Sequence, residues 1–136
     1  MWNYEYSLDT PKPRHAIWSR YQDCGGWPKW DHGLDHVEVD GQLAVGTTGR
    51  LTPKGQAPIP FTVTDVDELA TFTDECSMGD LVIRFWHRLT ELDGQGTRVT
   101  HGVVISGPGA EQMGPKIGPA ITADIPASVA ELIKLA

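Results

Sequence analysis

Hydrophobic and polar residues alternate strictly at the start of the chain. Trp2, Tyr4, Tyr6 and Leu8 fall on one face of an extended backbone, and the polar residues between them fall on the other. A period of two residues is typical of a β-strand with one buried face. The pattern therefore predicts a half-buried strand over residues 2–8.

A short helix is expected after this strand. Thr10 followed by Pro11 is typical of an N-cap and a proline in the first helical turn. The glycine pair Gly25-Gly26 is expected to end the helix, and Trp27-Pro28-Lys29-Trp30 to form a tight turn or a second short helix. The buried side of the first helix would carry Ile17, Trp18 and Tyr21.

From residue 34 onward the pattern changes to short apolar segments separated by turn-forming residues. Six further strands are expected at residues 34–39, 45–52, 59–65, 70–77, 81–92 and 97–106. The breaks between them are too short for a parallel crossover. The six strands are therefore expected to form an antiparallel meander.

The C-terminal segment has the period of a helix. Apolar residues recur every three or four positions and give one stripe: Met113, Ile117, Ile121, Ile125, Val129 and Leu132/Ile133. Pro115, Pro119 and Pro126 each remove a backbone donor, so kinks are expected. We expect this long helix to cover the concave face of the meander.

Length and charge narrow the possibilities further. A chain of 136 residues fits a single domain over residues 1–136, and its net charge of -7 argues against a nucleic-acid partner. There is no apolar run of about 18 residues, so no membrane span is expected. The first residues lack the order of a signal peptide, which makes the cytoplasm the expected location. Cys24 and Cys76 allow one disulfide at most.

The last two predicted strands carry the most informative pattern. Apolar side chains and both histidines occupy odd-numbered positions, among them Phe85 and His87 on the first strand and His101 and Val103 on the second. A three- or five-residue loop around Gly94 keeps odd positions opposite odd positions. This register sets His87 close to or directly across from His101, with both imidazoles on the face that looks toward the C-terminal helix.

Two imidazoles in an apolar interior allow three interpretations. In the simplest, the two side chains hydrogen-bond each other, a threonine or a water, and only satisfy the core. In the second they orient a hydroxyl or carbonyl of a ligand, and in the third they act as general acid and base. Burial would favour the neutral form of both histidines in every case.

Several other side chains are expected in or near the same interior. The residues expected to line a ligand cavity are Trp27, Trp30, Phe61, Phe72, Phe85, His87, His101, Val103, Met113, Ile117 and Ile121, although aromatic residues at strand spacing are also typical of plain core. Arg50 either points into the cavity as an anion or carbonyl contact or lies outside. His32 and His36 have H-x-x-x-H spacing, but they fall in a loop that leads into a strand, so no metal site is expected.

Five short motifs in a fixed order carry a family resemblance. They are Trp27-Pro28-Lys29-Trp30, Gly46-Thr47-Thr48-Gly49-Arg50-Leu51, Phe85-Trp86-His87, Gly96-Thr97-Arg98-Val99-Thr100 and Ser106-Gly107-Pro108. With the order strand, two short helices, six strands and long helix, the chain resembles the SRPBCC or START-like helix-grip superfamily, which includes lipid carriers and polyketide cyclase/dehydrase-like proteins. The resemblance implies an α+β fold in which a seven-stranded curved antiparallel sheet surrounds a long C-terminal helix and leaves an internal apolar cavity.

Function is less determined than fold, because one fold hosts many activities. We expect the protein to bind a small hydrophobic or aromatic ligand, lipids included, between the sheet and the C-terminal helix. The resemblance implies an alternative, an aromatase/cyclase or dehydratase acting on a polyketide-like substrate, with His87 or His101 moving protons and Arg50 polarising an oxygen. A third reading is a protein-interaction module without a ligand. No cofactor is expected, and a homodimer is left open.

Overall fold

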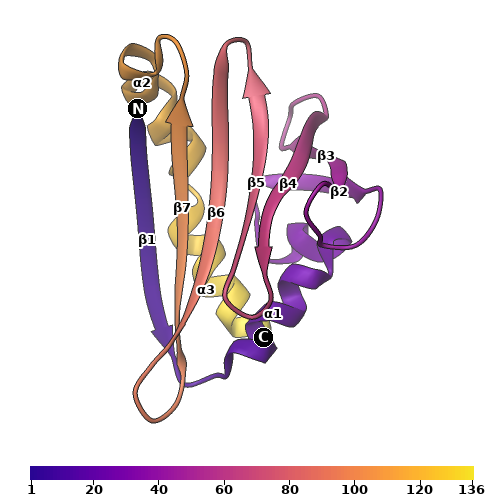
Figure 1. Cartoon of the computed structure of the whole chain (residues 1–136), viewed down its shortest axis with the longest axis vertical. Helices are drawn as coiled ribbons and strands as arrows, with labels where there is room; N and C mark the ends of the chain where they lie inside the picture. Colours follow the sequence, from indigo (N-terminus) through magenta and orange to yellow (C-terminus); the bar gives the residue numbers. More distant parts are fainter.

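All seven strands belong to one antiparallel sheet in the order β1-β7-β6-β5-β4-β3-β2. The computed structural model describes residues 1–136. Its elements are β1 (Trp2–Thr10), α1 (Arg14–Gln22), the 3-10 helix η1 (Cys24–Lys29), β2 (Leu34–Val39), β3 (Thr48–Pro53), β4 (Ile59–Asp67), β5 (Thr71–Met78), β6 (Leu81–Glu91), β7 (Thr97–Ser106), α2 (Ala110–Thr122) and α3 (Ile125–Leu135) (Figure 1). The predicted strand order and antiparallel pairing are confirmed.

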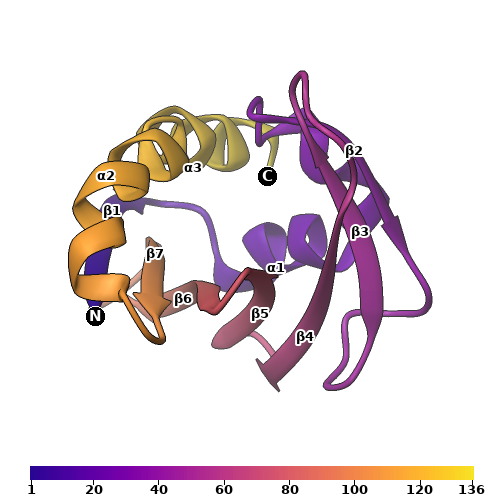
Figure 2. The ribbon, with the colours of Figure 1, turned by 90° about the horizontal axis from the view of Figure 1, so that it is seen from above.

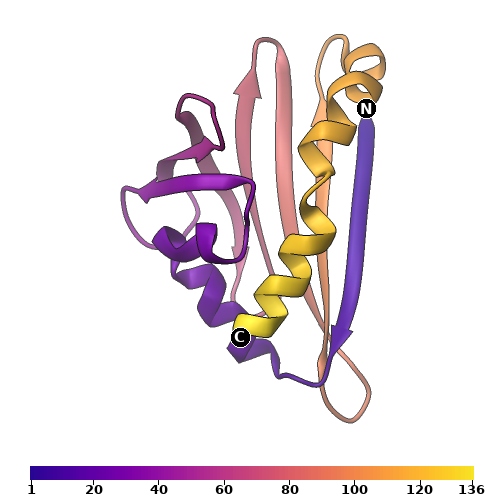
Figure 3. The same ribbon diagram turned by 180° about the vertical axis from the view of Figure 1, so that it is seen from behind.

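The sheet curves strongly, and the helices lie within its concave side. Seen from above, the strands curl from β1 round to β2, with α1 in the hollow and α2 and α3 across the opening (Figure 2). From behind, α2 and α3 run obliquely in front of the sheet (Figure 3). Both helices pack against β1 and β7, and α3 also contacts α1. The expected arrangement of a curved sheet around a C-terminal helical segment is therefore confirmed. None of the helices has both the length and the hydropathy to cross a bilayer.

Two sequence predictions about helix starts and breaks are wrong. Thr10 is not an N-cap: it is the last residue of β1, paired with Thr97, and α1 starts only at Arg14 after Pro13. The C-terminal segment, in contrast, is helical with an interruption, as expected: α2 ends at Thr122 and α3 begins at Ile125, with Pro126 in the first turn of α3, where its missing N–H is tolerated. The expected helix end at Gly25-Gly26 is also wrong, since both residues lie within η1.

The face that α2 buries differs from the predicted apolar stripe. Its buried residues are Ala110, Gly114, Gly118 and Thr122, which are small residues at four-residue spacing. Trp2 lies against the two glycines, and a Cβ atom added at Gly118 would come within 2.5 Å of its indole ring. Met113 is therefore turned outward and is 39% exposed. Its expected role in lining a cavity is wrong, because the helix rotates to let the indole approach.

The far end of the C-terminal segment is held by two cations. Lys12 Nζ donates to the carbonyl oxygens of Ile133 at 2.6 Å and Ala136 at 2.7 Å. Arg20 Nη2, from α1, donates to the carbonyl oxygen of Leu135 at 2.6 Å. The last carbonyls of a helix have no intrahelical partner and carry partial negative charge, so these contacts satisfy them and fix α3 against α1.

The contact between Trp2 and α2 gives a first prediction. Gly118→Ala should stabilise an exposed helix, since alanine is favoured over glycine by roughly 1 kcal/mol. Here the added methyl group meets the Trp2 ring, so we expect a loss of roughly 1–3 kcal/mol in the free energy of unfolding, measured by urea titration. In a Trp2→Ala background the same substitution should become neutral or stabilising. A more stable Gly118→Ala protein with Trp2 intact would contradict this packing.

Candidate functional site

A row of ring-bearing side chains crosses the centre of the concave face. The strand register places Phe72 opposite His87, His87 opposite His101, and His101 opposite Tyr6. Five residues, 92–96, connect Glu91 to Thr97 and preserve the parity of the two strands. The prediction that His87 and His101 lie directly across from each other is confirmed, and their rings meet edge to face with centroids 4.7 Å apart.

Aromatic side chains from α1 and η1 fill one half of the interior. Tyr21 of α1 packs edge-on against Phe72 at 4.9 Å between ring centroids, and Trp27 of η1 stacks on the same ring at 5.6 Å. Four residues expected to line a cavity are fully enclosed in this cluster: Trp27, Trp30, Phe61 and Phe72. They are packed core in this structure, because the residues of α1 and η1 occupy the space in front of them.

The hydrogen bonds of the histidines define their tautomers. His87 Nδ1 lies 3.1 Å from the carbonyl oxygen of Phe72, which can only accept, so Nδ1 carries the proton and Nε2 a lone pair. The Tyr21 hydroxyl lies 2.7 Å from His101 Nε2. This is the only partner of the hydroxyl, so Tyr21 donates and the His101 proton sits on Nδ1. The pair therefore offers one free acceptor, His87 Nε2, and one free donor, His101 Nδ1–H.

Both histidines are neutral because they are buried. Desolvation lowers the pKa of His87 to about 4, although the hydrogen bond to Phe72 opposes this shift. The pKa of His101 falls well below 6.5, first through desolvation and then through the proximity of His87. Desolvation also raises the pKa of Tyr21, so its hydroxyl keeps the proton that it donates to His101.

The other half of the concave face is less tightly covered. Phe85 lies on the inward face of β6 between buried Ile83 and His87, yet it keeps part of its surface exposed. Since β6 is an inner strand, that surface faces the concave side. Other side chains of the concave face and of α2 that are only partly buried are Tyr4 and Tyr6 of β1 and Ile117 and Ile121 of α2. We refer to the partly buried side chains Tyr4, Tyr6, Phe85, Ile117 and Ile121 as the open half of the interior. Val103, the register partner of Phe85 on β7, is fully buried.

Two open depressions elsewhere do not coincide with this interior. One, of about 300 Å³, is lined mainly by outward-facing residues of β4, β5 and β6, including Thr73, Trp86 and Arg88, and His87 also borders it. The other, of about 270 Å³, lies over β4 and β5 around Thr62 and Glu75. Both are open to solvent and lined mostly by polar residues, which does not fit the enclosed apolar site expected from the sequence.

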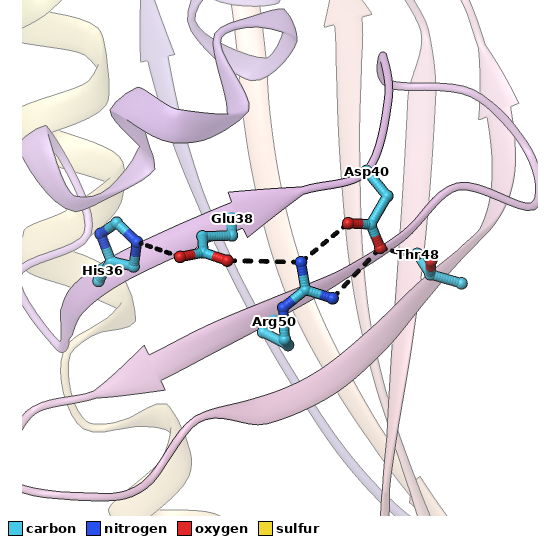
Figure 4. A network of polar contacts seen from close by, with 5 residues as sticks. All are labelled: His36, Glu38, Asp40, Thr48 and Arg50. Atoms are coloured by element: carbon cyan, nitrogen blue, oxygen red, sulfur yellow. Dashed lines mark hydrogen bonds and ion pairs between the residues drawn. The ribbon is translucent and has the colours of Figure 1, made fainter.

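Arg50 does not reach the interior. It lies on the outer face of β3, where its guanidinium donates to Asp40 at 2.8 and 3.2 Å and to Glu38 at 3.5 Å (Figure 4). Its neighbours Gly49 and Leu51 take the inward positions, so strand alternation forces Arg50 outward. The alternative in which Arg50 polarises a ligand oxygen inside the protein is therefore wrong.

His36 belongs to the same surface network rather than to a histidine pair. Its Nε2 lies 3.2 Å from Glu38 Oε1, and the Thr48 hydroxyl donates to Asp40 at 2.8 Å (Figure 4). Hydrogen bonds from Arg50 and then Thr48 lower the pKa of Asp40 to about 2. No three His, Cys, Asp or Glu side chains are arranged to share a metal ion. The two cysteines are free thiols.

Sequence reasoning missed a buried carboxyl group beside the histidines. Asp74 is 3% exposed and has neither an ion-pair nor a hydrogen-bond partner in the protein. It alternates along β5 with Phe72 and Cys76, so it points inward, and its register partner on β6 is Phe85. The sequence did contain a signal for this group: an acidic residue at a position of β5 where strand alternation predicts an apolar, inward-facing side chain. Desolvation, and then the charges of Asp31 and Glu75, raise the pKa of Asp74 to about 8.

The buried histidines predict acid lability with a defined pH window. The unfolded chain binds protons below pH 6.5, while folded His87 binds one only near pH 4, so its burial costs stability as the pH falls between these values. We expect His87→Gln to lack roughly 3 kcal/mol of that loss at pH 4. Its free energy of unfolding, measured by urea titration, should therefore fall less than that of wild type between pH 7 and pH 4. Parallel curves for His87→Gln would show that His87 is not held neutral.

Comparison with known proteins gives the fold and the family. A truncated norcoclaurine synthase from Thalictrum flavum superposes with a TM-score of 0.76 at 16% identity, covering 98% of this chain and 91% of that one. Ara h 8.0201 superposes at 0.75 with 17% identity, covering 97% and 95%, and Ms6760 from Mycobacterium smegmatis at 0.67 with 23% identity, covering 98% and 89%. No curated protein matches the sequence. The family model described as polyketide cyclase / dehydrase and lipid transport matches residues 1–136, and the chain belongs to this family.

Proposed function

We propose that this protein binds a small, uncharged apolar or aromatic molecule against the open half of the interior, between β1, β7, β6 and α2. The observation that carries the proposal is the exposed inward surface of Phe85 beside two buried, neutral histidines with unused hydrogen-bonding atoms. An apolar wall with a few convergent polar groups is typical of small-molecule sites.

The size of the open half favours a compact ligand over a two-chain lipid. The aromatic cluster around Tyr21 and Phe72 occupies the remaining interior, so long acyl chains would have to displace α1 or η1. Burying about 200 Å² of apolar surface is worth roughly 5 kcal/mol, which corresponds to an affinity near the millimolar range. Hydrogen bonds to His87 Nε2 and His101 Nδ1–H would then supply tighter binding and fix the orientation of the ligand.

The electrostatics of the interior favour an uncharged ligand. His87, His101 and Tyr21 are all neutral near pH 7, and no buried lysine or arginine lies among the buried residues. A charged ligand would lose its hydration without gaining an ion pair, which costs several kcal/mol.

Catalysis of a cyclisation or dehydration receives less support from this geometry. The family description and the likeness to a norcoclaurine synthase make such chemistry worth testing. However, general bases work best with a pKa near the operating pH, and the pKa of His87 is about 4. We therefore place His87 and His101 as ligand contacts and not as proton carriers.

Filling the open half should abolish binding. Phe85→Trp adds volume at the inward surface of β6, whereas Val82→Trp adds the same group on the outer face of the same strand. A thermal-shift and native mass spectrometry screen of compact aromatic ketones, phenols and phospholipids should find a compact aromatic binder of wild type. Phe85→Trp should weaken that binder at least tenfold, and Val82→Trp should leave it unchanged.

Two outcomes would contradict this function. One is a wild-type protein that binds none of the compact molecules in the screen. The other is a binder that Phe85→Trp and Val82→Trp affect equally, because that ligand would then lie outside the open half of the interior.

A further inference from the structure

Asp74 has an environment that a structural carboxylate would not tolerate. It is the only acidic or basic residue other than histidine among the buried side chains, and no cation lies against it. Its neighbour Glu75 points to the opposite face and pairs there with Arg84. An unpaired buried carboxylate costs several kcal/mol, so a residue without a role at this position would be expected to be apolar.

The carboxyl group borders space and is not sealed in the core. Trp30 Nε1 is the only buried side-chain nitrogen or oxygen that is both unpartnered and fully enclosed. The oxygens of Asp74 have no partner either but are not fully enclosed, so they keep a small accessible surface. Phe85, directly opposite on β6, belongs to the open half of the interior. Asp74 therefore stands at the edge of the proposed ligand site.

The surroundings of Asp74 keep the group protonated near neutral pH. The titratable groups that act on it or feel its charge are Asp31, Glu75, Cys24 and Cys76. None of the four is a cation. Asp31 in contrast is partnered, because it accepts from the Gly33 N–H at 3.1 Å and from the Ser128 hydroxyl at 3.4 Å. Burial raises the pKa of both carboxyl groups, but hydrogen bonds oppose the rise only at Asp31, which leaves Asp74 as the O–H donor.

We propose that Asp74 donates a hydrogen bond to a carbonyl oxygen of the ligand, so that the site selects neutral aromatic ketones or related carbonyl compounds. This assignment rests on the proposed function and names its substrate class. Phe85 is the register partner of Asp74, and His87 lies two residues further along β6, so Asp74 and His87 are diagonal neighbours on one face of the sheet. Such neighbours are roughly 7–8 Å apart, about the width of one or two fused aromatic rings. A ligand with a carbonyl at one end and a hydroxyl at the other would satisfy Asp74 as donor and His87 as acceptor together.

Two matched probe pairs test the assignment. The two members of a pair differ only in a carbonyl group that replaces a methylene group: 2-acetonaphthone against 2-ethylnaphthalene, and acetophenone against ethylbenzene. Binding is measured by calorimetry at pH 6.5 and pH 9.5 in wild type, Asp74→Asn and Asp74→Leu. Asparagine keeps an N–H donor and cannot titrate, whereas leucine has a similar shape and no donor.

We expect wild type at pH 6.5 to prefer a ketone over its hydrocarbon by about 3–10-fold, the range of one hydrogen bond. The preference should disappear at pH 9.5, where Asp74 is ionised, and it should disappear at both pH values in Asp74→Leu. Asp74→Asn should keep it at both. A ketone preference that survives in Asp74→Leu, or that is absent from wild type while the hydrocarbons bind, overturns the role of Asp74. Failure of all four probes to bind wild type overturns the proposed function and this inference with it.

A measurement without ligand checks the protonation state. The pKa of Asp74 is higher in the folded than in the unfolded protein, so its contribution to stability is lost as the pH rises from about 4 to about 8. Asp74→Asn cannot ionise, and its stability relative to wild type should increase steadily over this range in urea unfolding. Parallel stability curves would show that Asp74 is already ionised near neutral pH, and the proposal would then fail.

Discussion

Desolvation without compensating charge is the constraint on which the interior depends. The concave face of the sheet buries His87, His101 and Asp74, and none of them meets an ion of opposite sign. Each group can be accommodated only in its neutral form, as an imidazole or as a carboxylic acid. A neutral acid donates and a neutral imidazole can accept, so burial turns three titratable residues into a fixed pattern of hydrogen-bond donors and acceptors. In the function that we propose, this pattern would bind polar groups of an uncharged ligand.

The helices divide the concave face into a packed and an open part. Residues of α1 and η1 stack on Phe72 and close the side nearest β5. At the other side α2 lies over β1 and β7, and the buried face of α2 consists of the small residues Ala110, Gly114, Gly118 and Thr122. Tyr21 connects the two parts, because it packs in the aromatic cluster and donates to His101. The position of the His101 ring therefore depends on the same residue that fills the packed half.

Strand parity accounts for what the sequence could predict. The alternation of β6 and β7 and the odd-length loop between them determine that His87 faces His101, and no tertiary information is needed. At β3 the predicted strand began three residues early. The sequence therefore did not determine whether Arg50 points into the interior or outward. The face of α2 could not be predicted from hydrophobicity, because it is determined by the fit of Trp2 against Gly114 and Gly118, and glycine contributes no apolar signal. The sequence shows that Asp74 occupies an inward, apolar position of its strand. Its lack of a hydrogen-bond or ion-pair partner becomes known only when the neighbouring strands and their side chains are known.

The protonation of Asp74 and the position of the C-terminal segment are linked through Asp31. Burial raises the pKa of Asp31, the Ser128 hydroxyl in α3 opposes this rise by donating to Asp31, and Asp124 at the junction of α2 and α3 adds to it. After desolvation, Asp31 is in turn the charge that contributes most to keeping the proton on Asp74. A shift of α3 away from Asp31 would remove a donor from that carboxylate and weaken its charge, which would lower the pKa of Asp74. The C-terminal segment thus influences the pKa of Asp74, and a ligand bound as we propose would change the strength of its own hydrogen bond if it moved this segment.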